Sequence, residues 1–479
     1  MSSDMGRDMG RDMSRDLIRM SAVDLLAGYR SGSFSPREAT RAVLDRIHDK
    51  NDKINAFMII DDEGAMAAAG ASEARWAKGA PMGLLDGVPT TIKDLVLTKG
   101  WPTLKGSLTV DPAGPWEEDA PCVARLREHG AVLLGKTTTP EVGWKGLTES
   151  ALSGITRNPW NLAKTPGGSS GGASAALAAY MGPLAVGSDG GGSIRIPSSF
   201  TGVFGIKANY GRVPVYPESA MRTLSHVGPM TRSVRDAALM LNVLAEPDDR
   251  DHTALLYQGT DFTDGLDDGI AGLRIAYSPD LGYAKVDPEV ARIVEDAVSA
   301  FSDLGAHVER QDPGFANPKA MFKTHWWAGA AGAFAHLGAE KMAMLEPEFA
   351  QIVAEGAELS ILDYMRAMEG RSALCLHMRE FHRTYDLLLT PALAVPAFNV
   401  GRLQPPGSDP DDTFWMDWTP FSFPFNLTQQ PACSIPCGFT EDGLPVGLQI
   451  VADSFREDLV LRAAQAFETA RPIDREPNL

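Results

Sequence analysis

Eleven of the 43 residues from Thr165 to Lys207 are glycine, in the stretch TPGGSSGGASAALAAYMGPLAVGSDGGGSIRIPSSFTGVFGIK. Glycine loses more conformational freedom on folding than any other residue. A folded domain therefore keeps a high density of glycine only where a side chain would prevent the backbone from adopting its conformation or from approaching another group closely. Most of these glycines lie in two clusters that border serines, at residues 167–172 and 190–192. The stretch predicts two tight loops whose backbone N–H groups can converge on one point.

Ser193 follows three consecutive glycines and is the candidate nucleophile of this stretch. Converging backbone N–H groups beside its hydroxyl would form an oxyanion hole, which stabilises the charge that develops during acyl transfer. A nucleophilic serine needs a base. The nearest histidine along the chain is the distant His226, which could act only by folding back, and no G-x-S-x-G elbow surrounds Ser193. A lysine kept neutral by desolvation can replace histidine, and Lys93 is the best placed, at the polar end of the apolar run GVPTTIKDL.

Strand and helix patterns alternate along the chain. Apolar, β-branched runs predict strands at residues 87–95, 130–137, 273–280, 385–392 and 444–453. Capping signals and apolar periodicity predict helices at 36–49, 120–129, 233–244, 287–304 and 456–469. This alternation is typical of α/β proteins, whose helices cover a largely buried sheet. No linker divides the chain, so we expect one domain over residues 17–479, with a mainly helical cap or insertion around 310–385.

The bulk properties exclude several classes of protein. The net charge of −18 argues against a nucleic-acid partner, which would require a basic surface. No apolar run reaches the length of a membrane span, and four scattered cysteines do not form a disulfide framework. Residues 1–16 contain a charge-balanced MGRD-type repeat without a following apolar run, so we expect a disordered tail rather than a secretory signal. These observations predict a cytoplasmic protein.

Residues 130–137, GAVLLGKT, match the phosphate-loop pattern G-x-x-x-x-G-K-[ST]. That motif works as a flexible loop between a strand and a helix. Here the four middle residues are Ala-Val-Leu-Leu, a helix is predicted before the motif, and Thr-Thr-Pro follows it. We therefore interpret the match as a core strand and not as a nucleotide site.

Five stretches together resemble the amidase signature family: GVPTTIKDL, TRNPWNL, TPGGSSGGASAALAA, GSDGGGSIRIPSSFTGVFGIK and DGLPVGLQIV. The resemblance covers residues 20–470 and implies an α/β fold in which helices cover both faces of a large mixed sheet. It also implies a Ser–cis-Ser–Lys triad with Ser193 as nucleophile, Ser169 as bridging serine in a cis peptide bond, and Lys93 as base. The oxyanion hole would consist of the backbone amides of Gly190, Gly191, Gly192 and Ser193. The resemblance implies no metal or cofactor.

Other residues in these motifs receive secondary roles. Ser170 is either part of the hydrogen-bond network of the site or a helix cap. Asp189 and Arg195 flank the nucleophile and are interpreted as partners that hold its loop. Lys136 and Lys207 are interpreted as surface or structural lysines. Gly190 stands where the family usually has Thr or Ile, which would loosen the loop or enlarge the space over the nucleophile.

The family hydrolyses many carboxamides, and the triad does not choose among them. Apolar pocket candidates are Trp144, Trp326, Trp327, Phe421, Phe423 and Phe425, with core packing as the alternative for each. If several line the pocket, aryl amides, anilides or aryl carbamates fit better than small polar amides. The alternatives are the glutaminase subunit of a tRNA-dependent amidotransferase and, from a different class, a non-catalytic anion-binding module. A homodimer is a candidate assembly by analogy with relatives.

Overall fold

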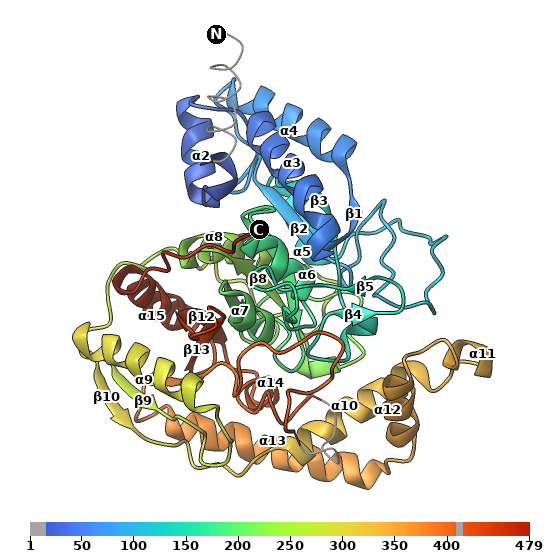
Figure 1. Ribbon diagram of the computed structural model, residues 1–479, viewed down its shortest axis with the longest axis vertical. Coiled ribbons are helices and arrows are strands. Elements are labelled where there is room, and N and C mark those ends of the chain that lie inside the picture. The colour runs from blue at the N-terminus through green and yellow to red at the C-terminus, as the bar shows by residue number, and fades with distance from the viewer. Residues whose placement is uncertain (1–15, 409–414) are drawn as a thin grey trace.

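The computed structural model describes residues 16–408 and 415–479, so residues 1–15 with most of the expected tail lie outside it. A mixed sheet of eleven strands runs through the molecule in the order β1-β3-β2-β6-β8-β7-β12-β13-β11-β9-β10 (Figure 1). The strands are β1 (Phe57–Ile60), β2 (Pro89–Lys93), β3 (Val132–Thr137), β6 (Leu184–Asp189), β7 (Phe204–Lys207), β8 (His226–Thr231), β9 (Arg274–Tyr277), β10 (His307–Arg310), β11 (Leu387–Pro391), β12 (Ala432–Phe439) and β13 (Pro445–Ala452). Two short strands, β4 (Glu149–Ser150) and β5 (Gly154–Ile155), form a separate ribbon.

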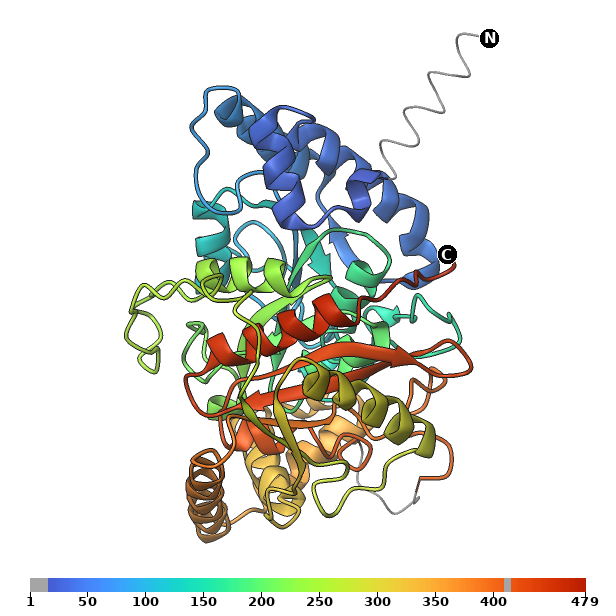
Figure 2. The same cartoon turned by 90° about the vertical axis from the view of Figure 1, so that its left-hand side faces the viewer.

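Helices cover both faces of the sheet, which confirms the predicted fold class. One face carries α5 (Pro121–Glu128), α8 (Val234–Leu244), α9 (Pro288–Asp303) and α15 (Glu457–Ala470), whose apolar residues share one large core with the strands. Figure 2 looks onto this face, with α15 in red across the strands. Near the other face lie α3 (Pro36–Ile54), α4 (Asp62–Trp76), α6 (Gly171–Ala178) and α7 (Arg195–Thr201). Helix α2 (Ala22–Ser31) precedes them at the N-terminal end.

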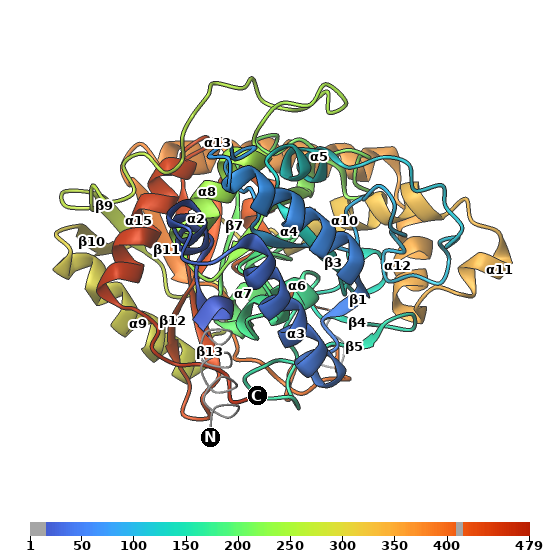
Figure 3. The same ribbon diagram turned by 90° about the horizontal axis from the view of Figure 1, so that it is seen from above.

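Four helices occupy most of residues 310–385. They are α10 (Lys319–Phe334), α11 (Ala339–Met342), α12 (Pro347–Ala357) and α13 (Ile361–Phe381), and they lie together at one end of the molecule (Figure 1). Seen from above, α10 and α12 extend to one side of the sheet (Figure 3). Short helical turns η1 (Glu141–Gly143), η2 (Arg222–Leu224) and α14 (Pro424–Leu427) complete the fold. None of the helices in the described ranges is long and apolar enough to cross a membrane.

Residues 132–137 of the phosphate-loop look-alike form β3, and all six are buried. This strand pairs in parallel with β2 on one side and antiparallel with β1 on the other. Its backbone N–H groups therefore serve the sheet, which confirms the interpretation as a core strand.

The sheet topology brings Lys93 close to the glycine-rich loop that contains Ser193. Strands β2 and β6 are parallel neighbours, so their carboxyl ends lie at the same edge of the sheet. Lys93 is the last residue of β2, and Asp189 is the last residue of β6. The glycine-rich loop that follows Asp189 therefore begins beside Lys93, although the two lie far apart in the sequence.

Helix α6 begins directly after the double serine, and all eight of its residues are buried. Its sequence, GGASAALA, contains small side chains almost throughout, which lets the helix lie inside the protein with no solvent-facing side. A Cβ on Gly172 would approach the backbone N of Thr138 to 2.5 Å, so this glycine is required for the close approach of α6 to the chain after β3. The first glycine cluster thus serves packing as well as the loop.

Candidate active site

Lys93 is completely buried at the end of β2 and makes three hydrogen bonds to serine hydroxyls. Its Nζ lies 2.8 Å from Ser169 Oγ, 2.8 Å from Ser170 Oγ and 3.0 Å from Ser188 Oγ. The peptide bond between Gly168 and Ser169 is cis, as the resemblance implies. The structure therefore joins the lysine to both members of the double serine, and to Ser188, which the sequence analysis did not single out.

Burial lowers the pKa of the Lys93 ammonium group well below its usual value, and the negative charge of Asp189 offsets only part of this effect. A charged ammonium without a carboxylate in hydrogen-bond contact is costly in such a place, so the neutral amine is favoured. A neutral amine has two N–H donors and one lone pair. Of the three surrounding hydroxyls, two can accept from it and the third can donate to it.

The hydroxyl of Ser170 cannot be the one that donates a proton to the Lys93 lone pair. Ser170 Oγ donates to the carbonyl oxygen of Ser188 at 3.1 Å and accepts from the Ser188 backbone N–H. It stands at the start of α6 but makes no capping bond with its side chain, so it belongs to the hydrogen-bond network of the site. The proton that reaches the Lys93 lone pair then comes from Ser169 or Ser188.

Ser193 lies in the loop between β6 and α7 and is 6% exposed. Its carbonyl oxygen accepts from the Ser170 backbone N–H at 3.1 Å, which connects the loop of this candidate nucleophile to the double-serine loop. Within the described ranges, no protein acceptor is bonded to the backbone N–H groups of Gly190, Gly191 or Ser193. These three amides are available to a ligand.

The expected set of oxyanion-hole amides is wrong at Gly192, because its N–H is already bonded within the protein. Its N–H donates to Asp189 Oδ1 at 2.7 Å. Gly192 has φ +123°, a conformation that L side chains rarely adopt, and a Cβ there would approach Ser422 Oγ to 2.7 Å. The third glycine thus shapes the loop and binds its supporting carboxylate, and the available set is reduced to Gly190, Gly191 and Ser193.

A completely buried ion pair supports the loop from behind. Arg195 Nη2 and Nε donate to the two carboxylate oxygens of Asp189 at 2.9 and 3.0 Å. Burial alone would raise the pKa of Asp189, but the charge and hydrogen bonds of Arg195 outweigh burial and hold this pKa well below its usual range. The guanidinium also donates to Asn426 Oδ1 and Gln449 Oε1, at 2.7 and 2.8 Å.

Replacing Arg195 with methionine should lower the free energy of unfolding by about 3–5 kcal/mol, because Asp189 would be left as a buried, unpaired charge. Denaturant titration followed by circular dichroism measures the change. The matched control is Arg235→Met, which breaks the exposed pair between Arg235 and Asp267 and should cost about 1 kcal/mol or less. Equal losses in the two variants would contradict the structural role of the buried pair.

The space beside Gly190 is filled and not open, contrary to the expectation of a looser loop or a larger pocket. A Cβ on Gly190 would lie 3.1 Å from Cζ3 of Trp326. The indole of Trp326 therefore occupies the volume that a side chain at residue 190 would need. Trp326 packs edge-on against Trp415, with their ring centroids 5.5 Å apart, and tilted against Phe322 at 5.4 Å.

The two other lysines of the motifs are buried, so the surface alternative for them is wrong. Lys136 Nζ donates to the Val96 carbonyl and to two threonine hydroxyls, while burial lowers its pKa to about 8. Lys207 Nζ donates to the carbonyl oxygen of Gln430. Each holds loop carbonyls in place, which is a structural role.

A cavity of about 290 Å³ opens beside the lysine and serine cluster. Ser188, which accepts from Lys93, forms part of its wall, and so does Val142, whose neighbour Gly143 lies close to Ser169. Most of the remaining lining is apolar: Leu95, Val96, Leu97, Val110, Trp116, Pro214, Val215, Met221, Val227 and Phe334. The cavity is therefore suited to a mainly apolar ligand.

None of the pocket residues proposed from the sequence lines this cavity. Trp144 and Trp327 are buried and donate their indole N–H groups to Glu346 and Glu355. Phe421 and Phe425 lie in the core beside β11 and β13. Trp326 and Phe423 pack with Phe322 in an aromatic cluster against the nucleophile loop. Sequence composition identified large aromatic residues but not which side of a helix or loop faces the cavity.

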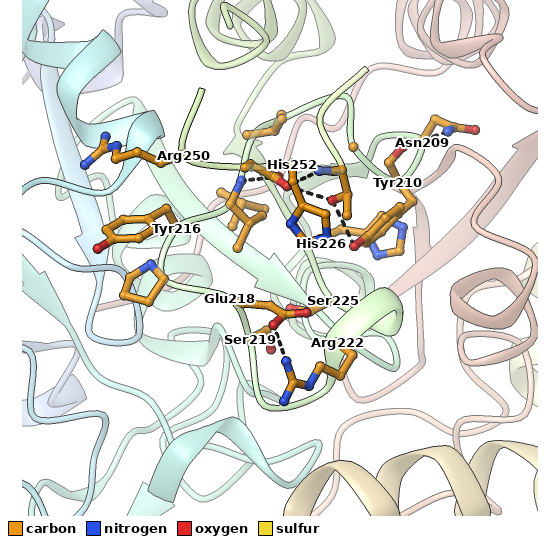
Figure 4. A pocket seen from close by; sticks show the side chains of 17 residues that line it. Asn209, Tyr210, Tyr216, Glu218, Ser219, Arg222, Ser225, His226, Arg250 and His252 are labelled. Atoms are coloured by element: carbon orange, nitrogen blue, oxygen red, sulfur yellow. Dashed lines mark hydrogen bonds and ion pairs between the residues drawn. The ribbon is translucent and has the colours of Figure 1, made fainter. Parts of the chain in front are cut away.

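A second cavity, of about 230 Å³, shares residues 215–219 of its lining with the first (Figure 4). His226 lines it, since β8 pairs with β6 and places His226 opposite Asp189. The distant histidine thus does fold back to the region. However, its Nδ1 is in contact with the carbonyl oxygens of Leu224 and Asp189, and burial lowers its pKa well below the usual value. These contacts hold the His226 ring against the backbone of Leu224 and Asp189. Within the described ranges, His226 makes no hydrogen bond with Ser193.

Comparison with known proteins agrees with this geometry. Residues 38–461 match the family model described as Amidase. The chain is 38% identical to an acylamidase of Rhodococcus erythropolis over 96% of this chain and 97% of the relative. It is 35% identical to a glutamyl-tRNA(Gln) amidotransferase subunit of Myxococcus xanthus, over 94% and 97%. Among solved structures, a bacterial aryl acylamidase of the amidase signature family superposes with a TM-score of 0.88 at 31% identity, covering 95% of this chain and 96% of that one.

The chain therefore belongs to the amidase signature family. It is a hydrolase that cleaves carbon–nitrogen bonds in linear amides.

Proposed function

We propose that this amidase hydrolyses acyl amides of aromatic amines through a covalent acyl-enzyme on Ser193. The observation that carries this proposal is the buried Lys93 amine, bonded to Ser169 and adjacent to a loop with three uncommitted backbone amides. A neutral lysine, a relay hydroxyl and an oxyanion site are the parts that serine-based acyl transfer requires without histidine.

In the proposed reaction, Ser193 Oγ attacks the carbonyl carbon while its proton passes to Ser169 Oγ and the Ser169 proton passes to Lys93 Nζ. The backbone amides of Gly190, Gly191 and Ser193 stabilise the oxyanion that forms. As the C–N bond breaks, the same relay returns a proton to the departing amine. Water then attacks the acyl-enzyme by the same route and releases the carboxylic acid.

The apolar lining of the cavity supports an aromatic or acyl group as the part of the substrate that it holds. Similarity to an acylamidase and to an aryl acylamidase favours the same substrate class. Aryl carbamates present the same carbonyl beside an aromatic group, so we include them as a second substrate type. Kinetics over a series from acetamide to acetanilide and phenyl carbamate test this: a preference for acetamide would contradict it.

Relatives that are subunits of a tRNA-dependent amidotransferase favour glutaminase activity as the second candidate. A glutaminase would have to bind the polar side chain of glutamine, which the mainly apolar cavity does not favour. Glutamine hydrolysis faster than anilide hydrolysis would establish this candidate instead.

We further propose that the protein is a homodimer and is located in the cytoplasm. Light scattering tests the homodimer, and fractionation of the source cells tests the location.

Treatment with a fluorophosphonate tests the nucleophile without a chosen substrate. We expect one adduct per chain by intact mass, located on Ser193 by peptide mapping, because the relay activates only this hydroxyl. The adduct should form far more slowly in Lys93→Met. An adduct on another serine, or none in the folded wild-type protein, would contradict the proposed mechanism.

A further inference from the structure

Lys105 stands in the wall of the cavity beside the lysine and serine cluster. Its φ of +56° lies in the left-handed region, which non-glycine residues adopt rarely and mostly where the surroundings impose it. Two hydrogen bonds impose it here: Lys105 N–H donates to the Asp94 carbonyl at 3.1 Å, and the Lys105 carbonyl accepts from Val142 N–H at 2.7 Å. Asp94 follows Lys93 directly, and Val142 also lines the cavity. The base of the side chain is thus fixed to the backbone next to the catalytic cluster.

The ammonium group of Lys105 has no committed partner. In the described part of the chain, no protein acceptor is in hydrogen-bond contact with its Nζ and no carboxylate forms an ion pair with it. Glu218, the other charged residue of the cavity wall, is engaged by Arg222 (Figure 4). By contrast, the ammonium group of the buried Lys136 donates three hydrogen bonds to oxygen atoms of the loop after β2. Lys105 is therefore a cation that the fold leaves available in an otherwise mainly apolar space.

Lys105 is an exposed residue of the cavity wall, and desolvation by the protein around its ammonium group lowers the pKa of that group, while Asp94 opposes the shift. Electrostatic attraction is stronger in such a recess than in open water. An anion that enters the cavity would meet Lys105 under these conditions, despite the net charge of −18 on the whole protein.

We propose that Lys105 is a specificity-determining residue that binds a carboxylate on the substrate, at the end of the apolar group that the cavity holds. The preferred substrates would then be amides that carry an acidic group, such as monoamides of dicarboxylic acids or acyl amides of aminobenzoic acids. This inference rests on the proposed function, since it assigns the substrate class of the same site. It does not involve Lys105 in the chemical steps.

Two matched substrate pairs test it. N-succinyl-4-nitroanilide against N-acetyl-4-nitroanilide places the carboxylate on the acyl side, and 4-acetamidobenzoate against acetanilide places it on the amine side. In one of the two pairs, Lys105→Met should lower the ratio of kcat/KM for the acidic over the neutral substrate by about 10- to 100-fold, which corresponds to loss of one charge-assisted hydrogen bond. We expect the effect mainly in KM, and the wild-type ratio should fall as salt is added.

Two further variants control the test. Lys105→Arg keeps the charge and should retain the wild-type ratio within about threefold. Lys99→Met removes one positive charge from an exposed position on the same connection and should leave the ratio unchanged. An unchanged ratio in Lys105→Met for both pairs, or equal losses on acidic and neutral substrates, overturns the inference while hydrolysis itself continues. If the wild-type protein hydrolyses no amide and takes no adduct on Ser193, the proposed function fails instead.

Discussion

Replacing Ser193 with alanine should lower kcat/KM for every amide substrate by on the order of 10⁴- to 10⁶-fold, as loss of a serine nucleophile does elsewhere. Ser193 Oγ is the atom that forms the bond to the acyl carbon in the proposed reaction, and no other hydroxyl lies in the loop with the three available amides. The substitution removes one small, partly accessible atom, so the fold should not change. Steady-state kinetics with an anilide, together with a thermal unfolding curve, measure both expectations.

The matched control is Ser174→Ala. Ser174 is another buried serine of the glycine-rich stretch 165–207, in α6, where its hydroxyl donates to the Gly171 carbonyl at 3.2 Å. This variant should keep activity within a few-fold of the wild-type value. If Ser193→Ala retained more than about one hundredth of the activity, or if both variants lost activity equally, Ser193 would not be the nucleophile.

Replacing Lys93 with methionine should lower kcat by on the order of 10²- to 10⁴-fold, the usual contribution of a general base. Methionine fills a similar volume but cannot accept the proton that leaves Ser169. Lys93→Arg should be as inactive as Lys93→Met, because a guanidinium stays protonated and offers no lone pair. Activity in Lys93→Arg close to that of the wild type would show that the positive charge, and not the neutral amine, is what the site needs.

The lowered pKa of Lys93 predicts how the activity and the stability of the wild-type protein depend on pH. In the wild type, kcat/KM should rise with pH as the amine loses its proton, with a midpoint below the ordinary lysine value of 10.5. Between that midpoint and 10.5, the unfolded chain binds a proton at Lys93 that the folded protein does not bind. The free energy of unfolding therefore rises with pH there, by up to about 1.4 kcal/mol per pH unit from this group.

Lys93→Met removes this contribution. Its free energy of unfolding should rise less steeply with pH than that of the wild type in the same window, as measured by denaturant titrations at several pH values. Identical slopes would mean that Lys93 keeps an ordinary pKa in the folded protein. Comparison of the two proteins isolates Lys93, because the other titrating groups are common to both.

Local sequence signals predicted much of this fold. The capping serine at residue 35 and the one at residue 233 each precede a helix, α3 and α8, and the apolar run before Lys93 forms β2. The strands that the sequence analysis did not assign include β6 and β7, which lie within the glycine-rich stretch, and the proline-interrupted β8 and β12. Glycine and proline weaken the strand pattern, and in these strands pairing within the sheet outweighs local preference.

The parts of the site that could not be predicted from the sequence depend on contacts between residues that lie far apart along the chain. Asn426 and Gln449 join the ion pair of Arg195 from segments more than 200 residues away. Likewise, only the close packing of β6 against β2 brings the Ser188 hydroxyl to Lys93. The motif predicted Gly192 as an oxyanion-hole donor, but its N–H is bonded to the Asp189 carboxylate, which the sequence does not reveal.

Helix α10 contacts both the glycine-rich loop before Ser193 and the cavity beside the lysine and serine cluster. Near its middle, the Trp326 ring fits against Gly190, and at its last residue Phe334 lines the cavity. An attempt to transfer substrate preference between related amidases by exchanging this helix would therefore also alter the surface against which the nucleophile loop rests. Residues 190 and 326 would have to be exchanged together, as a large ring opposite glycine or a smaller side chain opposite threonine. In the proposed site, one helix therefore contributes both to substrate selection and to the support of the loop that holds Ser193.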